Sequence, residues 1–259
     1  LKPENQVYRY NFFYDNCTTR ARNMIVNHLH GKVIYPTPKG QEPTFRSLIH
    51  EWNHNYEWSQ FGEDLLLGIN ADRKVSQSKQ QFLPDNLRRD FAKAIYNGAP
   101  IVMETHELLA PQNSIINTET PLSPLSVACI FVILCTIMMI VSNRKHKMYW
   151  IWDTILMLAA GLIGIIYFMM LFSQHPCVSF NVIICFFNPL PLFFLYKTIK
   201  KTRRQETNIW WKIWGSLIIL GFIGAFFQRI PTAVLIVALF LLLHCVLHIR
   251  LDRPVRKYN

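Results

Sequence analysis

The sequence predicts an α+β domain outside the membrane at residues 1–110, a polar linker at 111–120, and an all-α bundle of five membrane-spanning helices at 121–259. Charge and hydropathy both divide the chain in this way. Residues 1–120 carry 13 Lys and Arg against 13 Asp and Glu, whereas residues 121–259 carry 14 against 3. The whole net charge of +11 therefore belongs to the apolar half, and we expect membrane lipids and no nucleic acid among the partners.

Each of the five apolar runs is long enough to cross a bilayer, which takes about 20 residues. The runs are Pro121 to Ser142, Ile151 to Phe172, Cys177 to Tyr196, Ile209 to Phe227, and Ile230 to Ile249. Asp153 and Lys212 lie near the ends of their runs, where side chains reach the interface. Asn188 to Pro191 interrupts the third run, and its prolines predict a kink there. Tryptophans cluster at those ends of the runs that adjoin the basic loops, and they predict an interfacial belt. They are Trp150, Trp152, Trp210, Trp211 and Trp214.

The loops between these runs predict the orientation, because Lys and Arg in short loops favour the cytoplasmic side. Basic residues follow the first, third and fifth runs: Arg144, Lys145 and Lys147; Lys197, Lys200, Lys201, Arg203 and Arg204; Arg250, Arg253, Arg256 and Lys257. The two remaining loops hold Arg229 alone. The amino-terminal domain is therefore expected on the exterior side and the carboxy-terminus in the cytoplasm.

Cys17 is the only cysteine in the first 128 residues, and it starts an amphipathic segment with Ala21, Met24, Ile25 and Leu29 at helical spacing. Asn16 is a favoured N-cap residue, which places the thiol on the first helical turn. There the helix dipole and the free backbone N–H groups favour the nucleophilic thiolate. A small buried hydrophobe is the alternative interpretation of this cysteine.

The other cysteines predict neither a metal site nor a cofactor, because the sequence contains no CxxC or Cys/His zinc spacing. Four are interpreted as membrane-facing or packing residues within the spans: Cys129, Cys135, Cys185 and Cys245. Cys17 and Cys177 are left on the exterior side. A disulfide between Cys17 and Cys177 is conceivable in an oxidising compartment, although it would compete with catalysis.

The remaining amino-terminal segment predicts one strand and three further helices. Alternating aromatic residues from Tyr8 to Tyr14 predict a strand. Helices are expected from Thr44, over Phe61 to Leu67, and over Leu83 to Tyr96, the last with Leu87, Phe91 and Ile95 on one face. Five histidines are available as bases, each more typical of a surface or capping residue: His28, His30, His50, His54 and His106.

Four ordered motifs resemble the Lnb family, the lipoprotein N-acyltransferases of Bacteroidetes. They are Tyr8 to Arg22 with its Asp15-Asn16-Cys17-Thr18-Thr19 core, Thr44-Phe45-Arg46, Phe61 to Gly68 with Ala71-Asp72-Arg73, and Phe82-Leu83-Pro84-Asp85, followed by the multi-span region. The Asn-Cys pair at a helix start is also similar to the permuted papain-like acyltransferases. The resemblance implies a papain-like periplasmic domain, of which residues 1–110 hold the carboxy-terminal half, on a bacterial inner membrane.

The resemblance implies that Cys17 accepts a fatty acyl chain from a phospholipid as a thioester and passes it to the amino group of a diacylated lipoprotein. The backbone N–H of Thr18 would help stabilise the oxyanion and Asn16 would orient the turn. The implied substrate-binding residues are Tyr14, Arg20, Arg22, Arg46, Asp64 and Arg73. For the arginines, phosphate recognition competes with ion pairing to Asp15, Asp64 or Asp72.

The family's histidine belongs to a Gly-His-Ser motif upstream of the cysteine, and this sequence contains no such motif. The general base is therefore expected from an amino-terminal segment or fragment outside residues 1–259. Two alternatives remain for function: a membrane-tethered cysteine peptidase, and a non-catalytic lipoprotein-binding module in which Cys17 is only packed.

Overall fold

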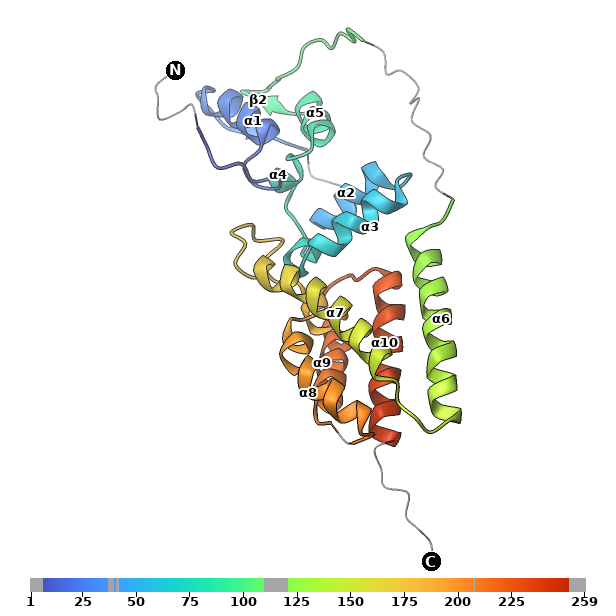
Figure 1. Ribbon diagram of the computed structural model, residues 1–259. Coiled ribbons are helices and arrows are strands. Elements are labelled where there is room, and N and C mark those ends of the chain that lie inside the picture. Colours follow the sequence, from blue (N-terminus) through green and yellow to red (C-terminus); the bar gives the residue numbers. More distant parts are fainter. Residues whose placement is uncertain (1–6, 37–39, 41, 110–120, 207, 252–259) are drawn as a thin grey trace, which may run out of the picture. The chain divides into compact units, whose positions relative to one another are not determined.

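This computed structural model describes residues 7–36, 40, 42–109, 121–206 and 208–251. The expected linker at 111–120 and the basic residues after position 251 lie outside these ranges. The chain forms two compact units (Figure 1). The first, here the cysteine unit, holds residues 1–52 and 73–118, and the second, here the membrane unit, holds 53–72 and 119–259. Residues 53–72, which the sequence grouped with the amino-terminal domain, thus pack with the membrane helices.

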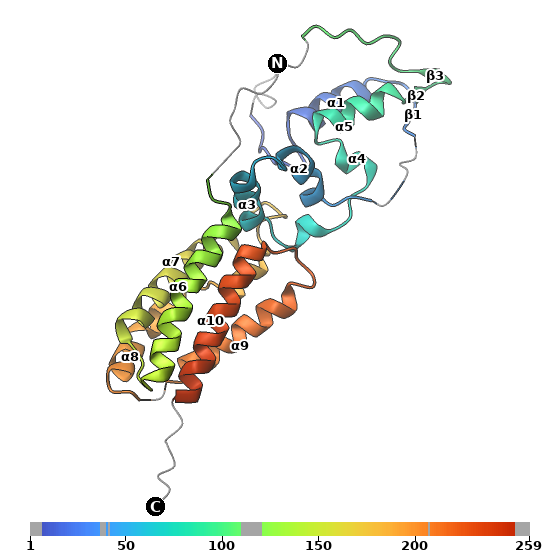
Figure 2. The ribbon, with the colours of Figure 1, turned by 90° about the vertical axis from the view of Figure 1, so that its right-hand side faces the viewer.

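The described part of the cysteine unit is helical with one small sheet. Its elements are α1 (Cys17–Asn27), β1 (Val33–Ile34), α2 (Phe45–Asn53), α4 (Gln77–Gln80), α5 (Pro84–Ala92), β2 (Ile95–Tyr96) and β3 (Ala99–Pro100). The strands pair antiparallel in the order β1-β2-β3, with Val33 opposite Tyr96 and Tyr96 opposite Ala99. Helices α1 and α5 pack side by side (Figure 2).

The predicted strand at residues 8–14 is wrong. Residues 11–15 form a tight turn in which Asn11 and Asp15 exchange two backbone hydrogen bonds of 3.0 and 2.9 Å. The aromatic alternation has a different cause: Phe13 is buried, whereas Tyr10 and Phe12 stay exposed. The turn points one ring into the core, and no neighbouring strand in the described part pairs with this segment.

Helix α5 is shorter than the sequence predicted, and its most buried residues are polar. Pro84 occupies its first turn, where a proline costs no hydrogen bond. The helix ends at Ala92, and Ile95 belongs to β2. Its buried residues are Asn86 and Asp90, which bond to Gln80 O at 3.1 Å and to the Gln81 amide at 2.8 Å. Hydrogen bonds thus offset the cost of burying polar side chains where an apolar face was expected.

The membrane unit consists of long apolar helices and one short amino-terminal segment. Its elements are α3 (Glu57–Leu66), η2 (Ile69–Asp72), α6 (Pro124–Arg144), α7 (Trp150–Met170), η3 (Val182–Cys185), α8 (Leu190–Arg203), α9 (Trp210–Gly224) and α10 (Thr232–Leu251). Four segments of the described chain are long and apolar enough to cross a membrane: Pro124–Arg144, Trp150–Met170, Val182–Arg203 and Thr232–Leu251. Helix α9 is apolar but shorter. The main packing pairs are α7 with α8, α6 with α10, and α9 with α10.

The third apolar run is broken and not merely kinked. Its first half contains the 3₁₀ turn η3, and α8 begins only after Asn188 and Pro189. Helix α7 meets this break at Gly164, where an added β-carbon would overlap the backbone of Asn188. The glycine lets the two backbones approach, as small residues do between membrane helices.

The expected tryptophan belt is wrong for α9. Trp210, Trp211 and Trp214 are each at most 1% exposed and form a stacked row inside the bundle. The Trp214 indole donates to the carbonyl oxygen of Phe186 at 3.1 Å. These rings fill the core of the membrane unit because the apolar run alone does not tell which face meets lipid.

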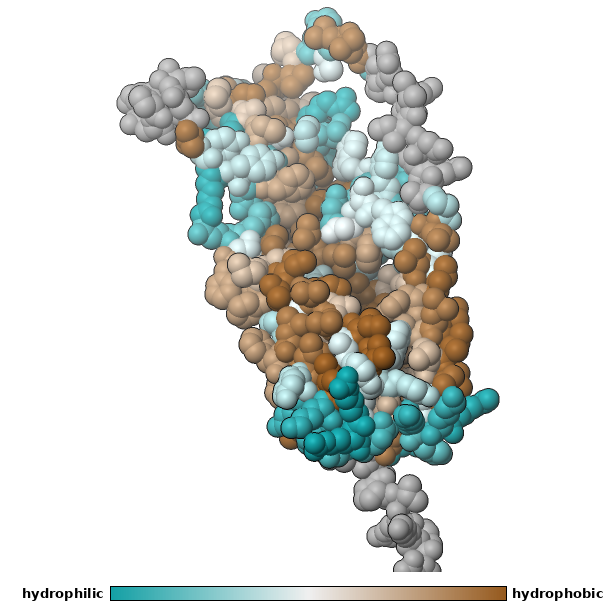
Figure 3. Space-filling view, in the orientation of Figure 1, coloured by the Kyte–Doolittle hydropathy of each residue, from teal (hydrophilic) through white to brown (hydrophobic). Residues whose placement is uncertain are grey.

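The basic loops gather at one end of the bundle. Helix α6 ends and α7 begins at this end, and α8 and α10 also end there (Figures 1 and 2). Figure 3 shows hydrophilic side chains capping this end of the bundle, below a hydrophobic band. At the opposite end, residues 65–72 bond to the loops around 177–181 and 228–229, for example Gly68 N to Cys177 O at 2.8 Å. The two ends of the membrane unit therefore differ sharply in charge.

Candidate functional site

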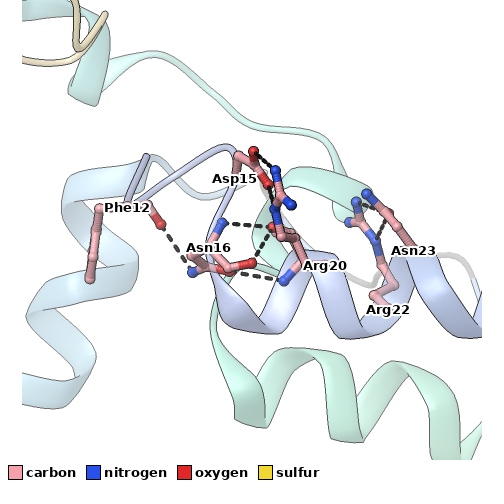
Figure 4. A network of polar contacts seen from close by, with 7 residues as sticks. Phe12, Asp15, Asn16, Arg20, Arg22 and Asn23 are labelled. Carbon is pink, nitrogen blue, oxygen red and sulfur yellow. Dashed lines mark hydrogen bonds and ion pairs between the residues drawn. The ribbon is translucent and has the colours of Figure 1, made fainter. Parts of the chain in front are cut away.

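Helix α1 begins at the cysteine because Asn16 caps it. The Asn16 side chain accepts the Thr19 N–H at 2.9 Å, and the Asn16 N–H donates to the Thr19 hydroxyl at 2.9 Å. The Asn16 amide also donates to Phe12 O and Phe82 O at 3.1 and 2.9 Å. Figure 4 shows this turn, with Asn16 between Phe12 and the first turn of α1. Such reciprocal capping fixes the backbone on which the thiol sits.

Three of the four sequence motifs meet beneath this turn. The rings of Phe13, Phe45 and Phe82 form a buried cluster with centroid distances of 4.5 to 5.6 Å. Each ring comes from a different motif, so the cluster joins segments that are distant in sequence. The remaining motif is different, because its residues 61–72 pack in the membrane unit.

The Cys17 thiol is exposed, so its interpretation as a buried packing residue is wrong. The capping scheme uses the N–H groups of Thr19 and Arg20 and leaves those of Cys17 and Thr18 out. These two groups are where an anion would bind at a helix start. Neither Cys17 nor Cys177 forms a disulfide in this structure.

Tyr10 is a neighbour of Cys17 that the sequence did not single out. Partial burial raises the pKa of the Tyr10 hydroxyl, and the nearby Cys17 and Tyr8 raise it further. The Tyr10 hydroxyl therefore lies close enough to Cys17 for the two groups to interact electrostatically. Its only signal in the sequence was its place in the aromatic run before the cysteine.

Arg20 is held on the surface by an ion pair. Its guanidinium binds the Asp15 carboxylate through two hydrogen bonds of 2.7 and 2.8 Å, visible in Figure 4. It also lies over the ring of Tyr8, 3.5 Å from the centroid. The hydrogen bonds from Arg20 lower the pKa of Asp15. Ion pairing, the alternative to phosphate recognition, thus describes Arg20 in this structure.

Arg22 and Tyr14 tie the turn to the α4 region. Arg22 donates to Ser78 O at 2.6 Å and to Asn23 Oδ1, the latter also drawn in Figure 4. The Tyr14 ring packs edge-on against Phe45 and lies 5.9 Å from the Lys79 ammonium. Both side chains therefore support the turn around Cys17.

The remaining expected binding residues differ in burial and belong to different units. Arg46 is buried at 1% exposure on α2, and Arg73 is exposed. Asp64 is a buried residue of α3 in the membrane unit. Among the histidines, His28 contacts its own helix at Met24 O, 2.6 Å away, and the exposed His106 pairs with Glu104.

The apolar stripe that predicted α1 faces outward. Met24 is 68% exposed and Ile25 is 47% exposed, and both lie on the same helix as the exposed Cys17. Tyr10 and Phe12, in the segment before the helix, are exposed as well. Exposed apolar side chains in one patch mark interaction sites, here beside a thiol.

Together these features define a multi-pass membrane protein whose cysteine unit presents an exposed cysteine at a capped helix start. A family model described as the Lnb transmembrane domain matches residues 116–254, more than half of the chain. The chain belongs to the Lnb family. Among curated proteins and among solved structures, no further match accompanies this one. Membership supports a function related to lipoproteins.

Proposed function

We propose that this chain is a lipoprotein N-acyltransferase with Cys17 as its nucleophile. The observation that carries the proposal is the exposed thiol on the first turn of α1, in a chain whose membrane domain is that of the Lnb family. The chain would lie in a bacterial inner membrane with five spans, α9 being the short one. The charge difference between the two ends of the bundle supports a periplasmic cysteine unit and a cytoplasmic carboxy-terminus.

In the first half-reaction, the Cys17 thiolate attacks the carbonyl carbon of a phospholipid ester. The carbonyl oxygen becomes an oxyanion, and the N–H groups of Cys17 and Thr18, which the capping bonds leave out, would stabilise it. The C–O bond to glycerol then breaks, the leaving alkoxide takes up a proton, and a lysophospholipid departs. The acyl chain remains on Cys17 as a thioester.

In the second half-reaction, the free α-amine of a diacylated lipoprotein attacks the thioester. The C–N bond forms, the C–S bond breaks, and the amine loses its proton as the thiolate is restored. The exposed apolar side chains of Met24, Ile25 and Tyr10 offer a surface for acyl chains on both substrates.

Intact-mass measurement of the full chain purified with phospholipid tests the proposal. The wild type should carry one fatty acyl mass that neutral hydroxylamine removes, and Cys17→Ala should carry none. Cys129→Ala is the matched control, because this half-buried cysteine lies on α6 within the membrane unit, and it should be acylated normally. Adding a synthetic diacylated lipopeptide should remove the acyl mass and yield the triacylated peptide.

The competing functions give different results in the same assay. A cysteine peptidase would cleave the peptide through a peptidyl thioester and carry no fatty acyl mass, and a binding module would retain the lipopeptide unchanged. Either result, or acylation of Cys17→Ala at the wild-type level, would refute the transferase.

The proton transfers need a base, which we assign to a histidine outside the set His28, His30, His50, His54 and His106. His28 and His106 are engaged by Met24 and Glu104. Replacing each of the five by Gln should leave acyl-enzyme formation within about 10-fold of wild type. Loss of a general base would instead lower the rate by roughly 100- to 10,000-fold.

A further inference from the structure

The membrane unit contains a buried cluster of one carboxylate and two imidazoles. Asp153 lies on the first turn of α7, and His244 and His248 lie near the end of α10. Nε2 of each histidine is 2.9 Å from the same oxygen, Asp153 Oδ1. The three side chains are between 1 and 3% exposed. The sequence placed Asp153 at the membrane interface, and that expectation is wrong.

The geometry is that of metal ligands converging on one point. One ligand atom from each residue lies within 4.8 Å of the others. His244 and His248 are four positions apart, the spacing that puts two imidazoles on one helix face and lets both bind one ion. Two imidazole nitrogens and a carboxylate oxygen form a donor set that suits zinc and related divalent transition metals.

Hydrogen bonding alone leaves this cluster incomplete. Asp153 Oδ2 and His244 Nδ1 are buried and bond to no other group in the part of the chain that the structure describes. A buried carboxylate also carries a charge that is costly in an apolar bundle unless a cation pairs with it. A divalent cation would neutralise that charge and give the second carboxylate oxygen a partner.

The surroundings favour an immobile, enclosed ion. The Trp211 ring stacks on His248 with centroids 3.8 Å apart, and it meets His244 edge-on at 5.3 Å. These contacts restrict rotation of the imidazoles, as supporting residues around a metal do. Helices α7 and α10 bring the ligands together from positions more than 90 residues apart.

We propose that Asp153, His244 and His248 bind one divalent transition-metal ion, of which zinc is the probe of choice, and that this ion links α7 to α10. The protein supplies three ligands, which leaves a fourth position for a water molecule. The proposal does not depend on acyl transfer, because the site lies at the basic end of the bundle and its test measures the metal directly.

Metal content of the detergent-purified full chain, loaded with Zn²⁺ and dialysed, tests this site. We expect about one Zn²⁺ per chain for the wild type. Asp153→Asn and His248→Gln should weaken binding by roughly 100-fold or more, since even supporting residues contribute 10- to 100-fold. His106→Gln, an exposed histidine of the cysteine unit, is the matched control and should bind like the wild type.

Cobalt substitution supplies a second readout on the wild type alone, so the test does not rely on the folding of variants. Co²⁺ should give the intense visible bands of a four-coordinate site. Failure of the wild type to retain Zn²⁺ above the dialysis blank, or the weak spectrum of octahedral aqueous Co²⁺, would overturn the proposal. Equal metal binding by Asp153→Asn and the control would also overturn it.

Discussion

The Asn16 side-chain amide donates a hydrogen bond of 2.9 Å to the carbonyl oxygen of Phe82, 66 positions later in the chain. Asn16 therefore does two things at once: it caps α1 and it anchors the start of that helix to the segment before α5. The residue next to the thiol is thus determined by tertiary structure as well as by local capping.

Replacing Asn16 by Ala should loosen α1. The substitution removes the cap and two hydrogen bonds, and loss of a cap costs about 0.5 to 2 kcal/mol. Hydrogen exchange of the α1 amides in the full chain should accelerate by roughly 2- to 30-fold. Asn27→Ala, at the exposed end of the same helix, serves as the control and should leave exchange at residues 17–22 unchanged. Equal protection in Asn16→Ala would contradict the anchoring role.

The ion pair between Asp15 and Arg20 should make local stability depend on pH. Arg20 lowers the Asp15 pKa in the folded chain, so the pair stabilises the fold above the ordinary carboxyl pKa of about 3.9. That contribution is lost as pH falls through the lower, folded pKa. Both side chains are more than 40% exposed, so the effect is small.

Thermal melting of the wild type and Asp15→Asn in a neutral detergent checks this dependence. Asp15→Asn should melt lower at pH 7, and the two curves should converge as the medium becomes more acidic than about pH 3. A difference that persists unchanged at low pH would mean that Asp15 acts through packing and not through its charge.

Orientation can be measured with a membrane-impermeant maleimide. The exposed Cys17 thiol should react in intact spheroplasts if the cysteine unit is periplasmic. In a chain carrying Cys17→Ser, a cysteine introduced at Lys145, in the exposed loop after α6, should react only after the membrane is permeabilised. The reverse pattern would place the basic end of the bundle outside.

Glycine substitutions should separate close backbone packing from simple helix propensity. Gly164→Ala would push a methyl group into the backbone of Asn188, so the detergent-solubilised chain should melt several degrees lower. Gly62→Ala on α3 is the matched control, because nothing lies within 4 Å of the added carbon. It should be neutral or stabilising by up to about 1 kcal/mol. Equal melting of both variants would contradict close contact between α7 and the break before α8.

Local signals predicted parts of this fold well. The helix start at Cys17 follows from Asn16 and Thr19, whose capping bonds depend only on residues three positions apart. The start of α2 follows in the same way from Thr44, which exchanges hydrogen bonds with Ser47. The start of α5 follows from Pro84, because proline favours the first helical turn. The bilayer-length apolar runs predicted helices because backbone groups in lipid must bond within their own segment.

Other features depend on contacts that no local pattern encodes. The aromatic run before Cys17 alternates like a strand, yet only Phe13 of this run is buried, because its ring packs against Phe45 and Phe82. The sequence around Trp210 and Trp214 is equally apolar whether their side chains face lipid or protein, so it does not predict their burial. Asp153 looks like an interfacial charge until α10 brings His244 and His248 to it from 91 and 95 positions away.

Because of residues 53–72, no single cut in the chain separates the two units. The chain leaves the cysteine unit after residue 52, contributes α3 and η2 to the membrane unit, returns at residue 73, and leaves again near 118. Phe61 and Leu65 of this excursion pack against the core of the membrane helices. A truncation before α6 would therefore remove α3 and η2 from the membrane unit. The apolar side chains that contact Phe61 and Leu65 would then be exposed. Because segments of the two units alternate along one polypeptide, neither unit can be transferred to another protein as one continuous segment.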